Sequence, residues 1–213
     1  MNFGLLFNQM FFASLTTIEI FFLTLIFALP LGLIISFGRM SKYKAISIPT
    51  NIYILLMRGT PLMLQLMFVF YGLKPLFGIQ VPRFPAAIIA FSLNYAAYFA
   101  EIYRGGIQAI PIGQYEACKV LGFSKKQTFF RIILPQVIKK IMPAMGNEFI
   151  TLVKDTSLAQ TIVVIEIMRV TQKFASAYVS AVPFAVAAIF YLIMNGILTK
   201  IFSCIENKLS YYR

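Results

Sequence analysis

The sequence contains no histidine and no tryptophan, and only two of its 213 residues are cysteines. Without histidine the chain lacks the commonest metal ligand and the usual general base. The two cysteines, Cys118 and Cys204, are too few for a disulfide framework. Charged residues make up only 12% of the chain, whereas soluble domains carry about 25%. We therefore expect neither a metal site nor a soluble enzyme.

Apolar residues are correspondingly abundant, at 60% of the chain. A soluble domain of this length buries only about 70% of its surface. The remaining apolar side chains would form wide patches in water, which soluble monomers avoid. The composition therefore predicts an all-α integral membrane protein, with residues 1–213 forming a single transmembrane domain in the lipid bilayer.

Five apolar stretches are long enough to cross the bilayer, which takes about 20 residues. They cover residues 10–37, 46–73, 84–103, 141–165 and 181–204. The second stretch is interrupted by Arg58-Gly59-Thr60-Pro61. This pattern resembles a helix restart, with Thr60 as its cap and Pro61 in its first turn, and a structural kink is the alternative that we favour.

The basic residues are distributed unevenly between the two sides of these stretches. Three lie between the first and second stretches, with Arg58 counted on the same side at the interruption of the second. Seven lie between the third and fourth, and three at position 200 or later, which makes fourteen of nineteen. Cytoplasmic loops carry the Lys and Arg excess, so we expect the N-terminus outside and the C-terminus in the cytoplasm. Because these residues are dispersed over three segments, the net charge of +12 does not indicate a nucleic-acid partner.

Residues 104–140 form the longest connection and contain several helix signals. Residues 113–121 predict a short helix that ends at Gly122 in a left-handed conformation. Ser124 and Gln127 have the spacing of a capping box that starts a second helix, and Pro135 is expected to bend or end it. The pattern alone leaves open whether this projection rests on lipid headgroups or docks a partner.

Several motifs resemble those of a known family. Glu116-Ala117-Cys118, Gly122, Ile132 and Leu134-Pro135 have the spacing of the EAA loop of ABC-importer permeases, with Cys118 where that family usually has alanine. The segments RGTPLMLQL, SLNYAAYFAEIYRGGI and NEFITLVKDTSL resemble the polar amino acid branch of these permeases. The resemblance extends from Arg58 to Glu166.

This resemblance implies the fold of a type I ABC-importer permease. It also implies that residues 104–140 dock a separate ATP-binding subunit through Glu116, Ala117, Gly122, Ser124, Leu134 and Pro135. The chain has no G-x-x-x-x-G-K-[ST] phosphate loop, so the partner would bind ATP, and this chain would be no enzyme and carry no cofactor. A second permease subunit, identical or related, an extracellular solute-binding protein and a location in the bacterial cytoplasmic membrane are implied as well.

Charged residues within the fourth stretch point to a substrate site. Glu148, Thr151 and Asp155 lie on one helical face, and a charge inside a span costs roughly 2.5–3.5 kcal/mol unless it faces a cavity or partner. Ser157 and Gln160 have a capping-box spacing, which predicts that a helix ends near Asp155 and restarts at about Leu158. The positive end of the new helix would suit a carboxylate, and the acids would suit an amino group.

Asn94 and Tyr98 share a helical face with Glu101, which we expect near the cytoplasmic end. The predicted substrate-binding residues are Glu148, Asp155, Ser157, Asn94, Tyr98 and Gln65. Their alternative role is structural, because polar residues between membrane helices often bind helix to helix. The predicted function is import of polar amino acids, with the choice among basic amino acids, glutamine or glutamate, and cystine left open. A permease for another small solute and an ion-coupled transporter without an ATPase are the alternatives.

Overall fold

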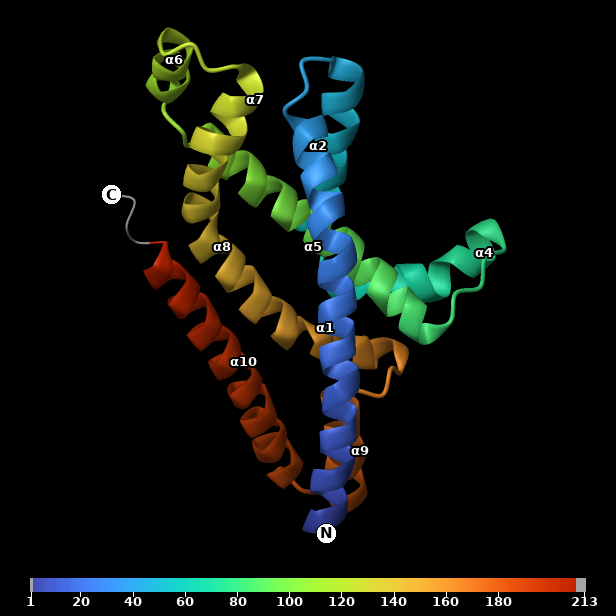
Figure 1. Cartoon of the computed structure of the whole chain (residues 1–213). Helices are drawn as coiled ribbons and strands as arrows, with labels where there is room; N and C mark the ends of the chain where they lie inside the picture. The colour runs from blue at the N-terminus through green and yellow to red at the C-terminus, as the bar shows by residue number, and fades with distance from the viewer. Residues whose placement is uncertain (1, 210–213) are drawn as a thin grey trace.

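The computed structural model describes residues 2–209, and this part of the chain forms helices joined by short connections (Figure 1). The α-helices are α1 (Phe3–Arg39), α2 (Lys44–Gly59), α3 (Leu62–Met67), α4 (Leu73–Phe77), α5 (Arg83–Gln108), α6 (Ile112–Val120), α7 (Lys125–Gln127), α8 (Leu134–Asp155), α9 (Ile167–Tyr178) and α10 (Val182–Lys208). Two π-helical segments, Phe68–Gly72 and Thr128–Ile133, and one 3-10 helix, Thr156–Ile162, continue these helices without a loop.

Helix α5 forms the centre of the fold and packs against α1, α2, α3 and α8. Its buried side chains include Ala86, Ala87, Ala90, Ala96, Ala97 and Ala100. Small residues let membrane helices approach closely. Close packing matters there because lipid is as apolar as the helices, so no hydrophobic effect drives the helices together. Gly32 of α1 serves the same purpose, since a Cβ there would lie 2.9 Å from the carbonyl oxygen of Ala96.

A Gly32→Ala substitution is therefore expected to destabilise the protein, by about 1–3 kcal/mol as is typical of overpacked cores. Gly196 in α10 is a matched control, because a Cβ there meets nothing within 4 Å. Gly196→Ala is expected to stabilise α10 by roughly 0.5–1 kcal/mol. Thermal unfolding of the two purified variants checks the opposite signs. Equal melting temperatures would contradict the close approach of α1 and α5.

Within residues 2–209, three helices are long and apolar enough to cross a membrane: α1, α5 and α10. Helices α2 to α4 make a fourth candidate if the bent pair Lys44–Gly59 and Leu62–Phe77 counts as one span. The remaining expected span, residues 141–165, falls mainly on α8 and the 3-10 helix. This segment is not among the helices that are apolar enough to cross a membrane by composition, because it carries charged residues such as Glu148 and Asp155.

The predicted break after Arg58 is confirmed, and the two parts are bent by 106°. The expected role of Thr60 is wrong, however. Thr60 ends α2 instead of starting α3, and its hydroxyl donates a hydrogen bond to the Leu56 carbonyl oxygen at 2.7 Å. The hydroxyl has this local acceptor one turn back, so it does not cap the helix that follows.

The segment between α5 and α8 largely matches expectation. Helix α6 is followed by Gly122 with φ of 75°, the left-handed conformation that glycine adopts without strain. Ser124 starts α7 with both hydrogen bonds of the capping box. The helix does not end at Pro135, which was one of the two expected outcomes, but continues past it into α8. The Leu134 N–H donates to the carbonyl of Phe129, five residues back, and this wider turn accommodates the proline without ending the helix.

Candidate functional site

The predicted coupling residues lie on a projection formed by α6 and α7, at the end of the molecule opposite the N-terminus (Figure 1). Glu116, Ala117, Gly122 and Ser124 are exposed on it, whereas Leu134 and Pro135 are half-buried at its base. Cys118 is buried, at 4% exposure, so a small side chain is needed where α6 packs on the following segment. A cavity of about 510 Å³ between the two helices is lined by Tyr115, Lys119, Phe123, Lys125, Thr128 and Phe129.

The two acids of α8, Glu148 and Asp155, are both half-buried. The hydroxyl of Tyr95, on α5, donates a hydrogen bond to Asp155 Oδ2 at 2.7 Å. Tyr95 is 2% exposed, so this bond fastens α8 to α5 in the protein interior. Glu148 is half-buried and belongs to none of the ion pairs in the described residues. Arg58 and Asp155 are the charged side chains that act on it electrostatically.

Ser157 does not start a new α-helix, so this prediction is wrong. Helix α8 does end at Asp155, but the chain tightens into the 3-10 helix Thr156–Ile162. The Ser157 hydroxyl donates to the Lys154 carbonyl oxygen at 2.7 Å and caps no N–H group. The expected positive helix end near Leu158 is therefore missing, and Ser157 keeps only its half-buried position near the acids.

The next helix N-terminus is that of α9, and Glu166 already occupies it. Its carboxylate accepts hydrogen bonds from the N–H groups of Met168, at 2.8 Å, and Arg169, at 2.7 Å. Tyr191 of α10 donates a third at 3.1 Å. Glu166 is fully buried, and its role is to cap α9 and join it to α10. Sequence reasoning passed over this residue, although an acid directly before a helical pattern is a usual capping signal.

The structure brings Asn94 and Gln65 together, and the two side chains are hydrogen-bonded to one another. The Asn94 side chain donates to Gln65 Oε1 at 3.0 Å and to the Met57 carbonyl oxygen at 2.8 Å. Gln65 donates in turn to Met57 and to Thr60, at 3.0 and 2.8 Å. Both amides thus bind the carbonyl groups left free where α2 ends. The geometry favours their structural role, and a contact with substrate stays a prediction.

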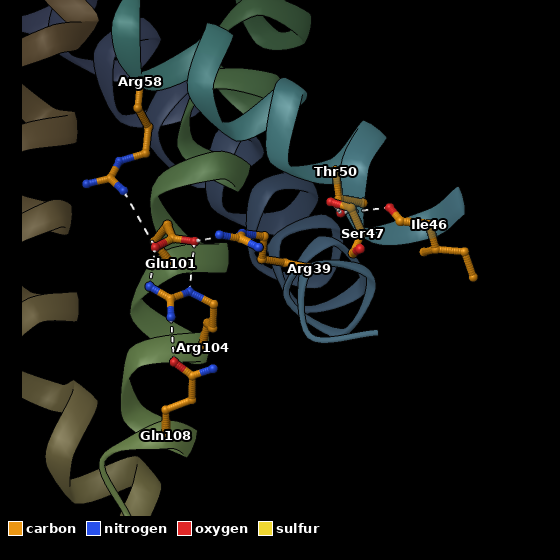
Figure 2. A network of polar contacts seen from close by, with 8 residues as sticks. All are labelled: Arg39, Ile46, Ser47, Thr50, Arg58, Glu101, Arg104 and Gln108. Atoms are coloured by element: carbon orange, nitrogen blue, oxygen red, sulfur yellow. Dashed lines mark hydrogen bonds and ion pairs between the residues drawn. The ribbon is translucent and has the colours of Figure 1, made fainter. Parts of the chain in front are cut away.

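Glu101 lies on α5 beside a group of arginines from three helices (Figure 2). Tyr98 lies on the same helix, three residues before Glu101. Arg104 binds both carboxylate oxygens of Glu101, at 2.6 and 3.0 Å. Arg58 and Arg39 approach the same carboxylate from α2 and α1, at 3.9 and 4.0 Å. The Arg58 guanidinium also lies over the Tyr98 ring, 5.1 Å from its centroid.

Sequence reasoning had placed Glu101 on the face of Asn94 and Tyr98 but had missed its three arginine partners. Arg104 follows Glu101 by three residues, so its pairing could have been predicted from helical spacing. Arg39 and Arg58 come from other helices, and no local pattern indicates that they meet at Glu101.

The chain matches the family described as binding-protein-dependent transport system inner membrane component over residues 28–211. It is 40% identical over 198 residues to the L-cystine transport system permease protein TcyB of Bacillus subtilis (strain 168), covering 92% of this chain and 84% of the relative. The arginine transport system permease protein ArtQ of the same organism is 39% identical over 194 residues, covering 91% and 89%. A chain in the crystal structure of an amino acid ABC transporter with histidines superposes with a TM-score of 0.87 at 34% identity, covering 94% of each chain.

These matches decide against the ion-coupled transporter. A permease of this type works with a separate ATP-binding subunit and a solute-binding protein, so the chain is a membrane transport component and not itself an enzyme. It belongs to the family of binding-protein-dependent transport system inner membrane components, the permease subunits of ABC importers.

Proposed function

We propose that this permease imports polar amino acids across the bacterial cytoplasmic membrane and that Glu148 and Asp155 contact the substrate. The observation that carries the proposal is Glu148, an acid in a membrane-embedded helix that no ion pair in the described residues neutralises. Such a charge is costly in lipid, and a cationic amino group would offset that cost. Relatives named for L-cystine and arginine transport support the substrate class.

The topology of the proposed importer follows from the charge distribution. The α6–α7 projection and the connection between α1 and α2 lie at one end of the molecule, and the N-terminus lies at the other (Figure 1). The first end carries most of the basic loop residues. We therefore place the first end in the cytoplasm and the N-terminus outside.

The subunit arrangement completes the proposal. Glu116, Ala117, Gly122 and Ser124 would contact the ATP-binding subunit, with Leu134 and Pro135 supporting them from the base of the projection. Two permease subunits, identical or related, would enclose the path. No cofactor is needed in the permease, since ATP would bind to the partner subunit.

Reconstitution tests this function directly. The permease, its ATP-binding subunit and its solute-binding protein are placed in proteoliposomes, and uptake of labelled L-arginine, L-cystine and L-glutamine is measured. We expect ATP-dependent accumulation of at least one of the three and none when the ATP-binding subunit is omitted. Transport of a sugar or an inorganic anion with no amino acid uptake would overturn the substrate class.

A further inference from the structure

An amino acid at Glu148 brings a carboxylate that needs a cationic partner of its own. The helix end expected to supply it near Leu158 does not exist, because the chain there forms a 3-10 helix. The N-terminus of α9 is already filled by Glu166. The carboxylate partner must therefore be a basic side chain close to the acids of α8.

Arg58, which interacts electrostatically with Glu148, lines a cavity of about 430 Å³. The cavity lies between α1, α2 and α5, and its polar lining includes Arg39, Asn51, Arg58, Tyr98 and Glu101. Small-molecule sites in proteins typically measure about 300–1,000 Å³, so an amino acid fits. By contrast, Lys154 lines a separate and mainly apolar cavity with Met168, Phe184 and Tyr191.

The charges around Glu101 do not cancel. Arg104 occupies both of its carboxylate oxygens with short hydrogen bonds. Arg39 and Arg58, at 4.0 and 3.9 Å, are beyond the distance of a hydrogen bond. Arg39 Nε is buried without a hydrogen-bond partner among the described residues. One acid thus faces three guanidinium groups, and the cavity has positive charge available for an anion.

Contacts connect Arg58 with the proposed substrate acids. Tyr95, bonded to Asp155, has its ring centroid 6.1 Å from that of Tyr98. Tyr98 in turn supports the Arg58 guanidinium. The side chain of Arg58 is 43% exposed, so a ligand can reach it. A carboxylate could displace Arg58 from Glu101 without breaking a hydrogen bond.

We propose that the Arg58 guanidinium, held over Tyr98, binds the α-carboxylate of an amino acid whose ammonium group points toward Glu148. This inference rests on the proposed function, since it assumes an amino acid at Glu148. Arginine suits the role because its planar fork can donate two parallel hydrogen bonds to a carboxylate. Arg58 would then distinguish amino acids from amines that lack the carboxylate.

The test compares each ligand with its α-amide, which lacks the carboxylate charge. Equilibrium binding of L-arginine, L-glutamine and their α-amides is measured on the purified permease–ATPase complex without binding protein. We expect the wild type to prefer the amino acid over its amide by about tenfold or more, the size of a charge-assisted hydrogen bond. In Arg58→Gln the preference should fall to near one, with affinity for the amide preserved, and Arg58→Lys should keep part of it.

Arg83→Gln is the matched control, because Arg83 is an exposed arginine at the start of α5 and is not among the residues that line this cavity. It should retain the wild-type preference. An unchanged preference in Arg58→Gln, an equal loss in Arg83→Gln, or a wild type that does not distinguish acid from amide would each overturn the proposal. Glu148→Gln distinguishes a failure of the Arg58 proposal from a failure of the proposed function. It should weaken binding of both the amino acid and its amide, and if it does not, Glu148 is not a substrate contact. Uptake by the complete importer tests the transported class independently.

Discussion

Gly122→Val is expected to reduce ATP-driven uptake by more than about tenfold and to weaken retention of the ATP-binding subunit. Gly122 has φ of 75°, and a residue with a Cβ pays roughly 1–2 kcal/mol in that conformation. Valine is branched at Cβ, which adds to the strain. The turn between α6 and α7 would open, and the exposed Glu116 and Ser124 would no longer keep their relative positions. Uptake in proteoliposomes and co-purification of the two subunits measure the effect.

Gly113→Val is the matched control for this experiment. Gly113 lies on the same projection, within α6, and it has neither a positive φ nor a neighbour within 4 Å of an added Cβ. We expect near-normal uptake from it. Gly122→Asn should retain more activity than Gly122→Val, because asparagine tolerates the left-handed conformation better. Normal uptake and co-purification in Gly122→Val would show that the turn does not position the coupling residues.

Glu148→Gln is expected to lower uptake by about tenfold or more, which corresponds to losing one charge-assisted hydrogen bond to the substrate. The change removes a negative charge that no ion pair in the described residues neutralises, so the fold should tolerate it. Assembly with the ATP-binding subunit should be unchanged, and the melting temperature should not fall. Substrate-stimulated ATP hydrolysis and uptake are the two measurements.

Asp155→Asn separates charge from structure at the second acid. An asparagine at this position keeps an oxygen that can accept a hydrogen bond from the Tyr95 hydroxyl, so the link between α5 and α8 should survive. Tyr95→Phe instead removes the donor and leaves the carboxylate in place. A transport loss in Asp155→Asn together with transport retained in Tyr95→Phe would assign Asp155 to the substrate. The reverse pattern would assign it to the fold, and normal transport in Glu148→Gln and Asp155→Asn would refute the site.

Local hydrogen bonds explain which helix boundaries were predictable. The turn at Gly122 and the capping box at Ser124 involve partners within three or four residues, and both are as expected. Thr60 and Ser157 were also expected to cap helices, yet each hydroxyl donates to a carbonyl three or four residues back. Threonine and serine have both options locally, and spacing alone does not choose between them.

Contacts between distant parts of the chain explain which side-chain partners could not be predicted from the sequence. Asn94 and Gln65 are 29 positions apart, and their mutual hydrogen bond depends on the bend between α2 and α3. Glu101 meets Arg39 and Arg58 only because α1 and α2 both pack against α5. Hydropathy and helical spacing place each residue on a face, but they do not say which faces meet.

The sequence by itself determined that the chain lives in a membrane, that residues 104–140 carry the spaced EAA pattern, and that Glu148 and Asp155 share one face of a helix. These properties depend on composition and on neighbours along a helix. Only the tertiary structure decided that Glu166 caps α9, that Asn94 donates a hydrogen bond to Gln65, and that Arg58 lies over Tyr98 beside Glu101. Each of these depends on helix packing, because a buried polar group takes whichever partner the neighbouring helix presents.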